Sequence, residues 1–179
     1  MKKISRYLII ALLVCSTLAL TAFTPFTSPQ ATGVVAATPK AQAGQRADKT
    51  MAFNLQREQN VLQRQQLHLT RASQVATKAQ ELIAKAQGNG VNVDALVKAL
   101  ADFNTKLSEA QKSHDQAASI LNAKTGFDGS GNVTDPKAAH QTLLAGRDAL
   151  RQTHLSLSSG VLTLRTAVQN WRIQNKGKK

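Results

Sequence analysis

Apolar residues recur at seven-residue intervals in three successive stretches between residues 50 and 179. The first stretch holds Leu55, Leu62, Leu69, Ala76 and Ile83, with a parallel row at Val61, His68, Val75 and Leu82. The second alternates intervals of three and four through Val93, Leu96, Leu100, Phe103, Leu107, Ala110, His114, Ala117 and Leu121. The third holds Leu143, Leu150, Leu157, Leu164 and Trp171. Because this period places one apolar stripe along each of three helices, it predicts helices that pack against one another.

Turn and capping residues separate these stretches. The run Gly88-Asn89-Gly90 ends the first helix by favouring left-handed backbone angles, and a polar, glycine-rich segment over 127–135 follows the second. Asn92 is expected to cap the second helix, and Asp135 the third, with Pro136 at its first position. The expected helices span 50–87, 92–124 and 135–174. The sequence therefore predicts an all-α fold over 50–179, an elongated antiparallel three-helix bundle or coiled coil.

Two glycines lie on the inner side of the third helix. Gly146 and Gly160 each cost about 1 kcal/mol relative to alanine in a helix interior, which suggests close approach of a neighbouring helix. Aligning the helices by their turns puts Gly160 near the level of Ala79 in the first helix. The alternative is that neither glycine matters to packing.

The first 49 residues differ in character from the helical part. Three basic residues precede an uncharged apolar run over 7–22, which is the pattern of a secretory signal peptide. We expect the signal to span residues 1–22, with cleavage after Ala22 or as late as Ala37, and residues 23–49 to form a disordered linker. The protein is then exported to the cell envelope, the periplasm or the extracellular space. An uncleaved amino-terminal membrane anchor is the alternative, although the apolar run is shorter than the ~20 residues that span a bilayer.

Charge adds a candidate binding surface. The formal net charge is +13, so anionic partners are expected. Five basic residues repeat every seven positions on the first helix, a set called here the basic stripe: Arg57, Arg64, Arg71, Lys78 and Lys85. Because they face away from the apolar seam, they are the candidate anion-binding residues. The alternative is an ordinary solvated face, in which Glu81 and Lys85 form an i,i+4 ion pair. No aromatic residue is interleaved with the stripe, so sequence-specific nucleic-acid binding is not expected.

The residue types needed for catalysis have simpler explanations. Asp94 and Asp102 stand four positions before Lys98 and Lys106, the arrangement of ion pairs on a helix surface. The serines lack the glycine-flanked elbow of hydrolases. We therefore expect a protein that is not an enzyme, with no catalytic residue.

Metal and cofactor sites are not expected either. Three histidines fall near the middle of the predicted bundle: His68, His114 and His154. No pair of them has the spacing of metal ligands on one helix, and no Glu-x-x-His motif accompanies them. The segment Asp128-Gly-Ser-Gly-Asn132 begins like a calcium loop, but Val133 and Ala139 occupy the positions that require glycine and glutamate.

Two resemblances concern exported proteins. The order of signal, threonine-rich linker and three helices ending in LRTAVQNWR (164–172) resembles that of uncharacterised exported helical-bundle proteins of bacteria. The run Leu69-Thr70-Arg71-Ala72-Ser73 is similar to the LTxxQ motif of small periplasmic proteins of the Spy and CpxP type, with serine in place of the final glutamine. These resemblances imply a helical fold and carry no activity.

Two functions remain from the sequence. The first is a non-enzymatic, exported protein that binds an anionic polymer, a lipid surface or an acidic protein through the basic stripe. The second is a holdase-like chaperone or a self-assembling scaffold, because Leu155 and Leu162 widen the apolar stripe of the third helix beyond what a three-helix core covers. Dimerisation would cover these leucines.

Overall fold

Three long helices account for nearly all of residues 40–175, which are the residues that the computed structural model describes. They are α2 (Lys40–Gly88), α3 (Asp94–Ala123) and α4 (Pro136–Gln174). No β-strand occurs within residues 40–175, where one isolated bridge joins Phe127 and Val133. The predicted all-α three-helix bundle is therefore confirmed. The predicted signal peptide over 1–22 and the linker as far as residue 39 lie outside the described residues.

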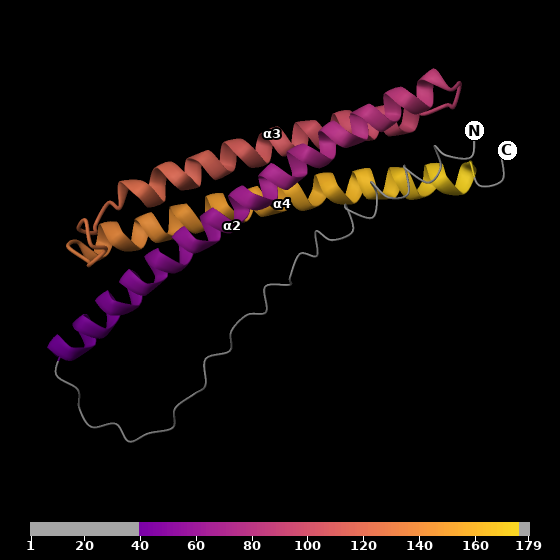
Figure 1. Cartoon of the computed structure of the whole chain (residues 1–179). Coiled ribbons are helices and arrows are strands. Elements are labelled where there is room, and N and C mark those ends of the chain that lie inside the picture. Colours follow the sequence, from indigo (N-terminus) through magenta and orange to yellow (C-terminus); the bar gives the residue numbers. More distant parts are fainter. Residues whose placement is uncertain (1–39, 176–179) are drawn as a thin grey trace.

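The helices do not contribute equally to the bundle. Figure 1 shows α3 and α4 side by side as an antiparallel hairpin, with α2 crossing this pair obliquely. The two helices of the hairpin pack more closely against each other than α2 packs against either of them. The amino-terminal end of α2 projects past the connection between α3 and α4 (Figure 1). The bundle is thus a tight hairpin with a third helix laid across it.

The start of α2 differs from the prediction. The helix begins at Lys40, so residues 40–49, for which the sequence predicts a disordered linker, are helical. This decapeptide contains three alanines together with lysine, glutamine and arginine, which are all good helix formers, and only Gly44 and Asp48 oppose them. Side chains over 43–47 are exposed, so intrinsic propensity rather than core packing favours this first part of the helix.

The core consists of two apolar clusters. One lies toward the α2–α3 turn and is built around Phe103, Leu100 and Leu164, with alanines as the buried residues of α2. The other lies toward the α3–α4 connection and includes Leu62 and Leu121. Three buried polar residues lie between the two clusters: His114 along α3, and Thr153 and Ser156 along α4. The predicted apolar rows therefore form the core, with a polar zone in its middle.

The helix ends agree largely with the predicted caps. The Asp135 carboxylate accepts hydrogen bonds from the backbone N–H groups of Lys137 and Ala138, and Pro136 stands at the first helical position, as predicted. The N-cap residue of α3 is Val93 rather than Asn92, although the Asn92 side chain still accepts a bond from the Asp94 N–H. The α3 cap is therefore shifted by one residue.

The two inner glycines of α4 both lie against α3. A Cβ atom on Gly146 would come within 2.5 Å of Leu121 Cδ2, and one on Gly160 within 2.9 Å of Lys106 Cβ and 3.2 Å of Phe103 Cδ2. The predicted close approach is thus observed, but the predicted partner helix is wrong for Gly160, which faces α3 and not Ala79 of α2. The absence of a side chain at these two positions lets the hairpin helices approach closely.

Candidate anion-binding surface

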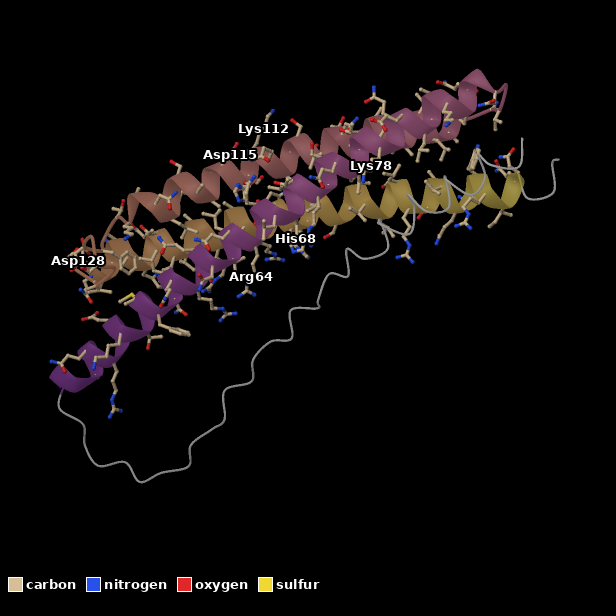
Figure 2. All side chains as sticks on the ribbon, viewed as in Figure 1. Arg64, His68, Lys78, Lys112, Asp115 and Asp128 are labelled. Carbon is tan, nitrogen blue, oxygen red and sulfur yellow. The ribbon has the colours of Figure 1, made fainter. Side chains whose placement is uncertain are left out.

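The basic stripe lies on the outer surface of α2. All five of its side chains are exposed, whereas the leucine row two positions earlier is buried or half-buried. In Figure 2, Arg64 and His68 project from α2 on the side away from α3, while Lys112 marks the far side of α3. The stripe is thus accessible from solvent along α2 from Arg57 to Lys85.

Hydrogen bonds from α2 to the hairpin show on which side of α2 the basic stripe lies. Gln59 Nε2 donates to the Leu121 carbonyl of α3 at 3.3 Å, and Gln65 Nε2 donates to the Leu150 carbonyl of α4 at 2.9 Å. Arg64 precedes Gln65 by one residue, so its side chain is rotated by about 100° around the axis of α2 from that of Gln65, in the direction away from α3. The stripe therefore opens on the side of α2 that adjoins α4. We call the surface formed by these two helices the α2–α4 face.

Arginines of α4 point to the same face. The carboxylate of Glu58 in α2 is nearly buried, and its Oε1 accepts a hydrogen bond from Arg147 Nε of α4 at 3.2 Å. Arg147 Nη2 also forms an ion pair with Oε1 at 3.2 Å. This contact fixes the side of α4 that adjoins α2. Arg165 follows 18 residues later, or about five helical turns, so it lies on the same side. Around the axis of α4, Arg151 and Arg172 point within about 40° of the direction of Arg147, and both are exposed.

The charge is concentrated in the two helices that form this face. Basic residues outnumber acidic ones by eight to three in α2 and by five to one in α4. In α3 three basic residues meet four acidic ones. An anion that approaches the bundle is therefore attracted to the α2–α4 face more than to α3.

The ion pairs expected from helical spacing are not formed. Within residues 40–175, no carboxylate oxygen lies within 4.0 Å of Lys85, so its predicted pair with Glu81 is wrong. Lys98 likewise has no such partner, and Lys106 pairs with Glu109 at 2.8 Å instead of with Asp102. The acidic residues of the surface thus do not neutralise Lys85 at the end of the stripe.

Two exposed apolar side chains accompany the stripe. Phe53 and Leu67 are 65% and 60% exposed on the outer side of α2. Phe53 stands one turn before Arg57, and Leu67 lies between Arg64 and Arg71. Phe53 precedes the first stripe residue, so the expectation that no aromatic residue is interleaved with the stripe stands, but an exposed Phe53 beside it was not predicted. Its position outside the heptad rows was the signal in the sequence that could have identified it.

The histidines do not come together. His114 is buried, and its Nε2 donates to the Leu62 carbonyl of α2 at 3.1 Å, while Nδ1 has no hydrogen-bond partner and lies 3.7 Å from Asp115 Oδ1. His68 is half-buried on α2 and His154 is exposed on α4. Over the described residues 40–175, no group of three or more His, Cys, Asp or Glu side chains could hold a metal ion. His114 therefore contributes a hydrogen bond between α3 and α2.

The loop with the calcium-like beginning closes on itself. The Asp128 carboxylate accepts hydrogen bonds from the Asn132 backbone N–H at 2.9 Å and from its side-chain amide at 3.0 Å. These bonds hold the pKa of the Asp128 carboxyl below its ordinary value. Lys124 Nζ donates to the Gly129 carbonyl at 2.9 Å, which ties the start of the loop to its tip. The two carboxylate oxygens of Asp128 and the Gly129 carbonyl thus have partners within the chain.

Comparisons with known proteins leave the site to be interpreted from its own chemistry. No protein-family model matches the chain, and no match is found among the curated proteins or the solved structures. None of the helices formed by residues 40–175 has a stretch that is both long and apolar enough to cross a bilayer.

Proposed function

We propose that the chain is an exported, non-enzymatic protein that binds an anionic partner through the α2–α4 face. The partner is an anionic polymer, a lipid surface or an acidic protein. The single observation that carries this proposal is the exposure of all five stripe residues on the side of α2 that adjoins the arginine-bearing side of α4. Two rows of cations along neighbouring helices bind an extended array of anions better than one row does.

The geometry suits an extended partner rather than a small anion. From Arg57 to Lys85 the stripe extends along about 40 Å of helix, with a cation at every second turn. No aromatic platform with several members lines it, so the attraction depends on charge and not on base stacking. Such binding weakens as salt screens the charges, over a Debye length of about 10 Å at 0.1 M.

The first test measures binding of the full chain to inorganic polyphosphate by fluorescence anisotropy, across a series of salt concentrations. We expect the affinity to fall steeply with salt, because each phosphate that the protein neutralises releases a counterion. Replacing Arg64, Arg71 and Lys78 together by glutamine should weaken binding and make the salt dependence shallower, by about one unit of slope for each phosphate that the variant no longer neutralises.

The matched control removes the same charge elsewhere. Lys98, Lys106 and Lys112 all lie on α3, outside the α2–α4 face; Lys98 and Lys112 are exposed and Lys106 is half-buried. Their replacement by glutamine leaves the same net charge as the stripe variant. If the two variants bind polyphosphate equally, the attraction reflects total charge and the proposal of a specific face is wrong.

A second candidate function is favoured by one observation. Leu155 and Leu162 are 50% and 64% exposed, as a holdase-like chaperone or a self-assembling scaffold would require. Sedimentation at micromolar concentration and suppression of client aggregation test this candidate. A monomer that protects no client would argue against it.

A further inference from the structure

Large apolar side chains form a line along the outer side of α4. This apolar line consists of Leu144, Leu155, Leu162 and Ile173, which are between 46% and 71% exposed. Their spacings of 11, 7 and 11 residues correspond to about three, two and three turns, so the four side chains deviate by only about 20° from one direction. The line is roughly 44 Å long. It lies opposite the buried face of α4, so the bundle itself leaves it uncovered.

Cationic side chains flank this line on one side only. Arg151, Arg165 and Arg172 lie between the apolar line and α2, whereas Gln152 and Asn170 occupy the other flank. On α2, Phe53 and Leu67 stand beside the basic stripe. The α2–α4 face therefore combines exposed apolar side chains with arginines on both of its helices.

We propose that the occupant of this face is the surface of an anionic lipid bilayer. The inference rests on the proposed anion binding and names its source as lipid. The apolar line inserts among the headgroups and upper acyl chains, while the arginines contact lipid phosphates, as in helices that lie in the plane of a membrane interface. A soluble polyanion would meet the arginines but would leave four large apolar side chains in water. Only a partner with both anionic and apolar surface matches the whole face.

A second copy of the chain matches the face less well. When two antiparallel copies of α4 pack about a twofold axis, the same flank of each copy meets the other. The arginine flank would then lie against its own equivalent, with like charges in proximity. In a parallel pair, the arginine flank of each copy would instead face the polar flank of the other, which holds Gln152 and Asn170. Charge therefore favours the bilayer over antiparallel self-association through α4.

A label on α4 tests the contact directly. Ser159 is exposed between Leu155 and Leu162, and Ser108 is exposed on α3. Because Cys15 is the only cysteine, Cys15→Ser combined with either Ser159→Cys or Ser108→Cys gives one attachment point for an environment-sensitive fluorophore. On vesicles of phosphatidylglycerol and phosphatidylcholine, we expect a blue shift and a several-fold gain in intensity at position 159, with little change at 108. Binding of the amino-terminal apolar run alone would not favour position 159.

Two variants separate the contributions of charge and apolar surface. Leu155→Gln with Leu162→Gln should reduce vesicle affinity about tenfold or more, because apolar area no longer leaves water, yet leave polyphosphate binding unchanged. The control is Val97→Gln, which alters an exposed apolar residue on α3 and should affect neither. Replacement of Arg64, Arg71 and Lys78 by glutamine should weaken both.

The outcomes distinguish this inference from the proposed function. Polyphosphate binding without a response at position 159 would overturn the lipid contact and leave anion binding intact. Failure to bind either polyphosphate or vesicles would overturn both proposals. Equal responses at 159 and 108, or a dimer that Leu155→Gln with Leu162→Gln converts to monomer, would assign the apolar line to another occupant.

Discussion

Gly146 offers a quantitative test of how closely α3 and α4 pack. A Cβ atom added at this position would lie 2.5 Å from Leu121 Cδ2 and 2.9 Å from its Cγ. Leu121 is fully buried, so its side chain cannot turn toward solvent. The substitution Gly146→Ala therefore forces either an altered Leu121 rotamer or a separation of the two helices.

Two opposing terms determine the expected effect on the free energy of unfolding. Overpacking of a filled core typically costs about 1–3 kcal/mol. Alanine in a helix interior returns about 1 kcal/mol relative to glycine. Gly146→Ala should therefore destabilise the protein by about 1 kcal/mol, with the helix propensity offsetting part of the clash.

A double-mutant cycle isolates the contact. Leu121→Ala alone should cost about 2–5 kcal/mol. In that background the atoms that clash are gone, so Gly146→Ala should become neutral or stabilising by up to about 1 kcal/mol. The coupling free energy between the two positions is then about 1–3 kcal/mol, within the range measured for neighbouring residues.

Urea unfolding followed by far-ultraviolet circular dichroism measures these differences. Gly44→Ala is the matched control, since nothing lies within 4 Å of a Cβ atom at this exposed position of α2. It should be neutral or slightly stabilising. If Gly146→Ala stabilises as the control does, or has the same effect with and without Leu121, the close packing inferred between the helices is wrong.

Two further predictions concern polar contacts. Arg147→Ala should lower the free energy of unfolding by about 1–3 kcal/mol, because the nearly buried Glu58 loses its partner. Replacing both Arg147 and Glu58 by methionine should be close to neutral. Equal reductions in the two variants, measured by urea unfolding, would contradict this prediction. Since the pKa of folded Asp128 lies below its unfolded value, its contribution to stability is present above the unfolded pKa and is lost as pH falls through the folded pKa. The stability difference between the wild type and Asp128→Asn should therefore shrink in acid, and a difference that stays constant down to about pH 2 would refute this assignment.

Much of the fold could be predicted because the spacing of the apolar residues along the sequence determines which side of a helix is buried. Leu62, Phe103 and Leu150 all lie in the core, as their heptad positions indicate. The oblique path of α2 could not be read from this pattern, because it depends on contacts between side chains and distant backbone groups. Neither could the α2 start at Lys40, because a short alanine-rich segment resembles a linker when no apolar period accompanies it.

The candidate site was predicted in part. The spacing of Arg57 and its successors correctly indicated an exposed row of cations on α2. The contribution of Arg165 and its neighbours required knowledge of which side of α4 adjoins α2. Phe53 was overlooked for a related reason, since a single apolar residue outside the rows has meaning only when its neighbours on the surface are known.

The polar contacts of α2 also restrict how far it can slide. A helix whose buried leucines recur every seven residues could move by about 10.5 Å along the hairpin and bury leucines again. Such a shift would bring Met51 or Gln65 to Arg147 in place of Glu58. It would also place Ala72, which cannot donate, or the carboxylate of Glu58 at the Leu150 carbonyl. A repeating apolar row therefore permits several registers, and a few hydrogen bonds at the crossing select the one that is observed.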